Sequence, residues 1–75
     1  MRRFFLNRIV DSSGVSGTGP VAEGICFSNG KCVLCWRTDT TSIGIYDDVE
    51  RLMKVHGHGG DTELVWIDAY MEAQI

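Results

Sequence analysis

The feature that most constrains the fold is an Asn-Gly pair between two strand-like runs. Residues 21–28 and 31–38 are both rich in apolar side chains, and Asn29-Gly30 joins them. Asn and Gly adopt positive φ easily, which both central positions of a type I′ turn require. The sequence therefore predicts a tight antiparallel hairpin with a two-residue turn.

This turn also predicts how the hairpin pairs, with Ser28 opposite Lys31 and Phe27 opposite Cys32. One side of the hairpin is then expected to face the core, and it carries Val21, Glu23, Ile25, Phe27, Cys32, Leu34, Trp36 and Thr38. The other side carries mostly small groups, which would let a helix or a second subunit approach: Ala22, Gly24, Cys26, Val33, Cys35 and Arg37.

The three cysteines are not expected to form a disulfide, because no two of them are opposed in this register. Cys32 and Cys35 form a C-x-x-C motif, but residues three apart on a strand point to opposite faces and cannot share a metal ion. We interpret the thiols as small buried side chains, and an odd number of unpaired thiols suits a reducing cell interior.

Three more strands and one helix are expected around the hairpin. The strands are assigned to residues 2–11, 42–46 and 62–68. The helix is expected to begin at Asp47, which has the capping-box spacing to Glu50, and to end at Gly57. Its apolar stripe consists of Val49, Leu52, Met53 and His56.

The resulting element order, β-β-β-β-α-β, predicts a mainly β (α+β) fold. We expect a small, strongly curved antiparallel sheet or barrel of about five strands with one short helix. An open sheet with the helix on one face is the alternative. Residues 1–75 are expected to form a single domain, with 69–75 as a tail or an oligomer arm. A chain this short buries only about 60% of its unfolded surface, which favours a homo-oligomer.

Charge and hydropathy exclude several classes of partner. The formal net charge of −3 argues against a protein that coats nucleic acid. No stretch of about 18 or more apolar residues is present, so no transmembrane helix is expected. We expect a soluble, cytoplasmic protein without a membrane partner.

The first candidate site is the glycine-rich loop at residues 56–62 (HGHGGDT). Its glycines can turn backbone N–H groups toward one point, and such concavities bind anions. His56 and His58 could donate hydrogen bonds to a phosphate. The alternative is a simple helix end followed by a turn, with His56 as a core residue.

The second candidate site is the loop at residues 12–20 (SSGVSGTGP), whose amides and hydroxyls could wrap a phosphate or a ribose. It matches neither the P-loop nor the dinucleotide-binding fingerprint, and a flexible connector is the alternative. Trp36 and Trp66 are core candidates that could also stack on a base, and Arg37 could pair with a phosphate.

Metal binding and catalysis are not expected. The spacing of His56 and His58 fits two metal ligands, with Asp61 or Glu23 as a third, but zinc sites normally use three or four. No Ser-His-Asp or Cys-His arrangement is defined, so no catalytic residue, metal or cofactor is assigned.

Several strings of the sequence resemble a known family. They are Val-Ser-Gly-Thr-Gly-Pro-Val-Ala-Glu-Gly (15–24), Phe-Ser-Asn-Gly (27–30), Val-His-Gly-His-Gly-Gly-Asp-Thr (55–62) and Val-Trp-Ile-Asp (65–68). Together they resemble a family of very small proteins of bacteriophages and of bacteria that carry phage-derived genes. The resemblance covers residues 2–68 and implies no particular activity, although many small phage proteins act against host defences.

The leading hypothesis is a non-catalytic, phage-encoded binding module that holds a phosphorylated small molecule, a nucleotide-type signal, between the two loops. The predicted ligand-binding residues are Ser13, Ser16, Gly17, Thr18, Trp36, Arg37, His56, His58, Gly59 and Gly60. One alternative is a protein–protein inhibitor of a host defence factor. Another is a small hydrolase with His56 or His58 as general base.

Overall fold

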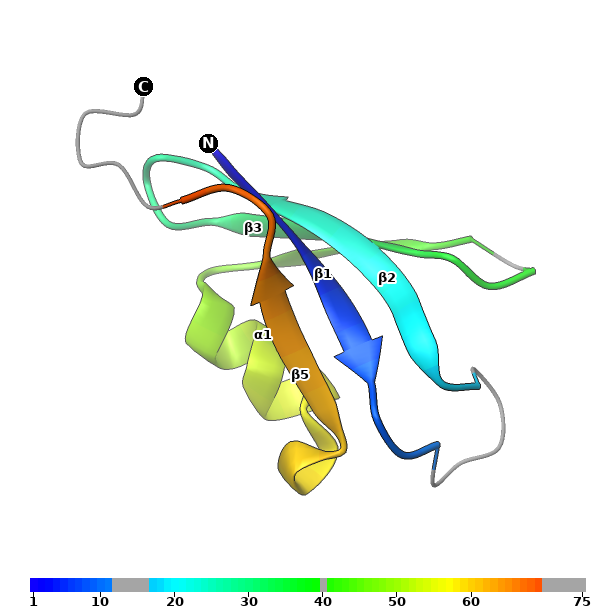
Figure 1. Cartoon of the computed structure of the whole chain (residues 1–75). Helices are drawn as coiled ribbons and strands as arrows, with labels where there is room; N and C mark the ends of the chain where they lie inside the picture. Colours follow the sequence, from blue (N-terminus) through cyan, green and yellow to red (C-terminus); the bar gives the residue numbers. More distant parts are fainter. Residues whose placement is uncertain (12–16, 40, 70–75) are drawn as a thin grey trace.

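The structure, a computed structural model, describes residues 1–11, 17–39 and 41–69. These residues form a five-stranded antiparallel sheet in the order β4-β3-β2-β1-β5. The elements are β1 (Arg2–Arg8), β2 (Gly19–Cys26), β3 (Cys32–Trp36), β4 (Ile43–Tyr46), α1 (Val49–His56), the 3₁₀ helix η1 (His58–Gly60) and β5 (Thr62–Trp66). The mainly β class and the position of the helix between the fourth and fifth strands are confirmed. The sheet is open, with β4 and β5 as its two edges (Figure 1).

The helix α1 covers one face of the sheet, which we call the inner face (Figure 1). Strand alternation brings Phe4 and Leu6 of β1 and Leu34 of β3 to this face, where Leu52 of α1 packs against them. All four side chains are fully buried and form the centre of the core.

The opposite face, which we call the outer face, carries no helix from the described part of the chain. The paired positions of the register place on it Arg3, Phe5, Asn7, Glu23, Ile25, Val33, Cys35, Ile43, Ile45, Glu63 and Val65. Ile67 continues this row past the end of β5, where its amide donates to the Arg3 carbonyl at 2.9 Å.

The β2–β3 hairpin is confirmed, but its register differs by one residue from the prediction. Cys26 pairs with Cys32, and the Phe27 amide donates to the Lys31 carbonyl at 2.8 Å. Gly30 has a φ of 94° and its amide donates to the Phe27 carbonyl at 2.9 Å. This is a three-residue loop, a turn followed by a left-handed glycine, which an Asn-Gly pair supports as well as the two-residue turn.

A shift of one residue moves the side chains of one strand to the opposite face. The β3 half of the predicted core side was right, since Cys32 and Leu34 are buried. The β2 half was wrong for Glu23 and Ile25, which lie on the outer face, and for Phe27, which is exposed.

The register also overturns the expectation about the cysteines. Cys26 and Cys32 lie directly opposite each other, with Cα atoms 4.2 Å apart, and their sulfur atoms form a disulfide. Both side chains are buried, as expected, but they are not unpaired thiols. Cys35 is a free thiol on the outer face, so the prediction that Cys32 and Cys35 point to opposite faces is confirmed.

A β-bulge adjusts the start of β2 to the core. Leu6 pairs with Ala22 whereas Asn7 pairs with Pro20, so Val21 is the extra residue. Val21 and Ala22 are both buried, which regular alternation would not allow. The Val21 carbonyl instead accepts a hydrogen bond of 2.9 Å from the Arg37 amide.

The helix begins one residue later than predicted. Asp48 is the N-cap, and its carboxylate accepts from the Arg51 amide at 2.8 Å. Asp47 pairs instead with Lys31 at 3.1 Å, and this ammonium group lowers the pKa of Asp47. The apolar stripe is confirmed, since Leu52 is buried and Val49 and Met53 pack on the core. No helix of the described ranges is long and apolar enough to cross a membrane.

Candidate functional site

Both glycine-rich loops leave the sheet beside the last residue of β1. Arg8 pairs with Gly19, where the 12–20 loop enters β2, and with Thr62, where the histidine loop enters β5. Just beyond Arg8, the amides of Ile9 and Val10 donate to the Asp61 carbonyl at 2.7 and 3.2 Å. The histidine loop and the described ends of the 12–20 loop therefore lie at one end of the molecule (Figure 1).

The histidine loop has the left-handed backbone that its glycines suggest. The φ angles are 50° at His58, 65° at Gly59 and 106° at Gly60. Gly57 at the helix end has a φ of −72° and does not take the left-handed conformation typical of a terminating glycine.

Most amides of this loop close the loop itself. The Gly57 amide donates to the Met53 carbonyl, the Gly60 and Thr62 amides to the Gly57 carbonyl, and the Asp61 amide to the His58 carbonyl. These hydrogen bonds do not use the amides of His58 and Gly59. At most the amides of His58 and Gly59, and not those of the whole loop, are available to bind an anion.

The other loop is described only in part. Ser13 and Ser16 lie outside the described residues, whereas Gly17 and Thr18 are exposed near the start of β2. The Gly17 amide donates to a carboxylate oxygen of Asp11 at 2.8 Å, and Gly17 has a φ of 76°. A protein carboxylate thus already occupies one amide that was predicted to hold an anion.

Arg8 is the most unusual charged group of the described residues. Its alternation with Phe4 and Leu6 turns it to the inner face, and it is only 6% exposed. Its Nε donates to Thr62 Oγ1 at 3.2 Å, and the guanidinium carbon lies 6.0 Å from the centre of the Trp36 ring. No carboxylate of the described residues lies within ion-pair distance of it. A buried cation normally has such a partner.

The rest of the Arg8 guanidinium is not sealed inside the protein. In the described part of the chain, no fully buried side-chain nitrogen or oxygen lacks a hydrogen-bond partner. The guanidinium nitrogens that Thr62 does not hold therefore reach the surface. Arg8 therefore presents N–H donors at the surface although the residue as a whole is buried.

His56 lies beside this cation. Its Nε2 is 2.6 Å from Tyr46 Oη, and its ring meets Trp36 edge to face at 5.0 Å between centres. Burial lowers the pKa of His56, and the positive charges of His58 and Arg8 lower it further. A neutral ring whose Nε2 carries no hydrogen can accept a hydrogen bond from the Tyr46 hydroxyl. A bound anion would offset the two positive charges and raise this pKa again.

We call Arg8, Trp36, Tyr46, His56 and Thr62 the inner cluster. It contains two of the predicted ligand-binding residues, Trp36 and His56, and the exposed His58 lies close enough to affect the His56 charge. Arg37 follows Trp36 at the end of β3 and is exposed. Because successive strand residues point to opposite faces, Arg37 does not share the inner face with Trp36.

Sequence reasoning missed Arg8, Tyr46 and Thr62. A signal for Arg8 was present, since Phe4, Leu6 and Arg8 alternate along β1 and a period of two places them on one face. Tyr46 and Thr62 carry no such signal, because only the register brings them beside residues distant in sequence.

No group of three or more His, Cys, Asp or Glu side chains in residues 1–11, 17–39 and 41–69 could hold a metal ion. The chemistry of the inner cluster is that of recognition: guanidinium and imidazole groups for negative charge, and an indole for an apolar or aromatic surface.

The fold and the cluster define a small α+β protein in which an open antiparallel sheet carries a cationic and aromatic site beside two glycine-rich loops. A comparison with protein families identifies it more closely. The family described as Acb5 phage protein matches residues 1–68, and the chain belongs to this family. Searches of curated proteins and of solved structures found no match.

Proposed function

We propose that the protein is a non-catalytic binding module that holds a phosphorylated small molecule of nucleotide type at the inner cluster, between the two glycine-rich loops. Its place in a phage protein family supports a phage-encoded protein. By analogy with other small phage proteins, it would act in the cytoplasm of the host cell and sequester a nucleotide signal of host defence.

The observation that carries this proposal is the Arg8 guanidinium, which is 6% exposed and has no carboxylate partner among the described residues. An uncompensated charge in such a setting costs free energy in the unbound protein. A phosphate that accepts from the free guanidinium nitrogens would offset this cost, since guanidinium and phosphate form short, charge-assisted hydrogen bonds. His58 and the amides of His58 and Gly59 supply donors on the loop beside it.

Trp36 gives the same place a surface for a base or another flat group. Its ring is half-buried between Arg8 and His56. Stacking of a base on an aromatic side chain contributes about 1–3 kcal/mol. A phosphate and a base on one ligand would use the guanidinium and the indole together, which favours a nucleotide over inorganic phosphate.

The test is calorimetry with the full chain against cyclic dinucleotides, ADP-ribose-type signals and mononucleotides. The matching nucleosides, which lack the phosphate, serve as ligand controls. We expect at least one phosphorylated ligand to bind and its nucleoside not to bind. Absence of binding to every ligand, with and without a divalent metal ion, would overturn the proposal.

A matched pair of variants tests the site. Arg8→Gln should abolish binding, whereas Lys54→Gln removes the same charge from an exposed position of α1 and should leave binding unchanged. Mass spectrometry of ligand released by denaturation should return it intact. A converted ligand would point to a hydrolase, and a stable complex with a host protein without ligand affinity would point to an inhibitor.

A further inference from the structure

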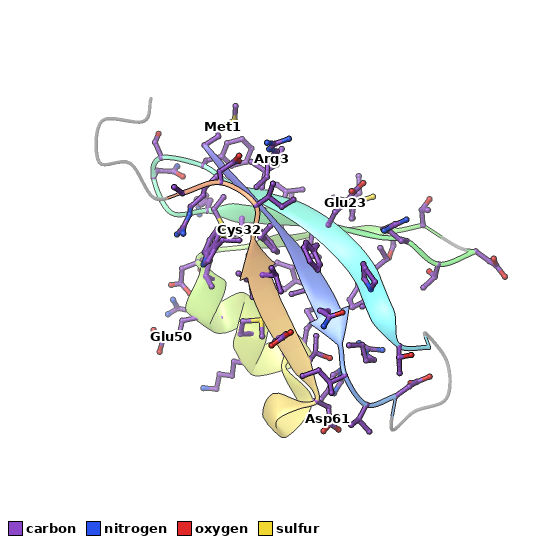
Figure 2. The ribbon with its side chains drawn as sticks, in the orientation of Figure 1. Met1, Arg3, Glu23, Cys32, Glu50 and Asp61 are labelled. Atoms are coloured by element: carbon purple, nitrogen blue, oxygen red, sulfur yellow. A yellow bond between two sulfur atoms is a disulfide. The ribbon has the colours of Figure 1, made fainter. Side chains whose placement is uncertain are left out.

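We propose that the outer face of the sheet is a dimer interface on which two copies of this chain pack face to face. This inference does not depend on the proposed function, because the outer face and the inner cluster lie on opposite sides of the sheet. Figure 2 shows Glu50 on α1, and it shows Arg3 and Glu23 on the opposite side of the sheet.

The outer face carries apolar side chains on all five strands, and a polar pair, Asn7 and Glu63, lies at the β1–β5 end of it. Ile43 and Ile45 of β4 are 68% and 75% exposed, and Ile67 beyond β5 is also exposed. Between these edges lie four half-buried apolar side chains, namely Phe5, Ile25, Val33 and Val65. Scattered apolar residues are normal on a surface, but a row that continues from edge to edge is typical of an interaction site.

A groove near the middle of this face has a volume of about 360 Å³ and could receive side chains from a partner. Its walls include Ile25, Phe27, Val33 and Ile67, and Gly24 also lines it.

The size of the face fits a pair of small subunits. Five strands at about 4.8 Å spacing and about five residues at 3.3 Å each give roughly 400 Å² in projection. Because side chains protrude from the sheet, the accessible area is larger than this projection and approaches the ~800 Å² per partner of a standard interface. A chain of 75 residues with a single small core also gains most from covering such a face.

The charges on this face favour a second copy over a partner of one sign. Glu23 is exposed near the groove and makes no ion pair with another described residue. Arg3 lies on the same face, and its guanidinium is 61% exposed although Asp68 pairs with it. In a two-fold arrangement the same patch meets itself, so Glu23 of one copy can approach Arg3 of the other, and the reverse.

The test is sedimentation velocity of the full chain over a range of concentrations. We expect a reversible dimer for the native chain. Ile45→Glu should weaken dimerisation by at least about tenfold, because it places a charge in the apolar contact. Val55→Glu is the matched control, since Val55 is a 60% exposed apolar residue on α1, and it should leave the dimer unchanged.

A second measurement follows the free thiol of Cys35, which lies on the outer face. Its alkylation should be slow in the dimer and faster in Ile45→Glu, at protein concentrations where the native chain is dimeric. A native chain that is monomeric at all concentrations, or a dimer unaffected by Ile45→Glu, would overturn the inference. So would a host protein that binds this face of a monomeric chain.

The two proposals fail independently. Arg8→Gln should remove ligand binding and leave the sedimentation of the dimer unchanged. Ile45→Glu should weaken the dimer and leave ligand binding unchanged. A variant at either position that changes both properties would contradict the placement of ligand and partner on opposite faces.

Discussion

Arg3 and Arg8 lie on the same strand but have opposite environments. Arg3 is on the outer face, and Asp68 accepts hydrogen bonds from its amide, its Nε and its Nη2 at 2.9, 3.0 and 2.8 Å. Arg8 is on the inner face, buried, and its side chain is bonded to the neutral hydroxyl of Thr62. The exposed cation has a carboxylate partner, while the buried cation, which needs a counter-charge more, has none among the described residues.

This difference indicates that the two arginines have different roles. The Arg3–Asp68 pair joins the start of β1 to the chain just after β5, and it stabilises the fold at the surface. Arg8 cannot be explained in this way, because a buried charge without a partner lowers stability. Such costs usually persist at functional sites, where a ligand supplies the missing interaction.

The comparison predicts opposite effects of the same substitution at the two positions, and this is the largest effect we expect. Arg8→Gln should reduce affinity for a phosphorylated ligand by about 100-fold or more, since a buried charge-assisted contact is lost. The unbound variant should be as stable as the native chain or more stable, because an unpaired buried charge is removed. Arg3→Gln should keep the affinity and slightly lower the stability. Calorimetry and thermal unfolding together measure both.

A variant that loses stability at Arg8 and affinity at Arg3 would reverse these roles. Equal losses of affinity at both positions would mean that only the overall charge of the protein attracts the ligand. Repeating the titrations at high salt separates these cases, because long-range attraction is screened while a buried contact is not.

The two tryptophans extend the comparison and give the next largest effect. Trp66 packs edge to face on Phe4 at 5.6 Å, and the Arg2 guanidinium lies 3.7 Å over its ring, whereas Trp36 lies beside Arg8 and His56. Trp36→Leu should weaken binding of a nucleotide about 10-fold or more, through the loss of stacking. Trp66→Leu should lower the free energy of unfolding by about 1–3 kcal/mol and leave affinity unchanged.

Calorimetry of both leucine variants, with unfolding followed by circular dichroism, tests this pair. If Trp66→Leu weakens binding more than Trp36→Leu does, the base lies at the other end of the inner face and the assignment of the cluster is wrong.

His56 gives a smaller effect that depends on pH. Burial and the nearby positive charges lower the pKa of His56 below its usual 6.5. The unfolded chain then binds the proton more readily than the folded protein does. Stability from this group is complete above about pH 6.5 and decreases as the pH falls from there toward the lower pKa of the folded state. Unfolding midpoints between about pH 8 and pH 5 should show this decrease, and His56→Gln should show less of it.

NMR titration of the His56 ring tests the same group in the presence of ligand. A bound phosphate should raise the pKa of His56, since it offsets the charges of Arg8 and His58. An unchanged pKa in a saturated complex would place the phosphate away from the inner cluster.

The sequence predicts the elements of this fold better than it predicts their pairing. The helix stripe of Leu52 and its neighbours and the hairpin around Asn29-Gly30 follow from local periodicity and turn chemistry. The hairpin register does not, because an Asn-Gly pair fits both a two-residue and a three-residue loop. That single choice decides whether Ile25 or Ala22 shares the core face and whether Cys26 meets Cys32.

The candidate site shows the same limit. The glycine-rich loops were visible in the sequence. The structure places Gly19 and Thr62, where the two loops enter the sheet, on opposite sides of Arg8. The importance of Arg8 depends on what surrounds it, and Thr62, Trp36 and Tyr46 come from three other strands. Strand alternation could indicate that Arg8 faces inward, but only the complete sheet shows that no described carboxylate accompanies it.

The smallest effect concerns the exposed member of the opening comparison. Hydrogen bonds from Arg3 lower the pKa of Asp68 to about 2, from an ordinary value of 3.8. The pair therefore contributes stability above about pH 4, and this contribution is lost as the pH falls toward 2. Because both groups are solvent-exposed, Asp68→Asn should lower the unfolding midpoint only slightly at neutral pH, and less at high salt. The difference from the native chain should shrink as the solution is acidified, without any change in ligand affinity. A large loss of stability at high salt would mean that Asp68 holds the end of β5 through its hydrogen bonds to the Arg3 amide and side chain more than through charge.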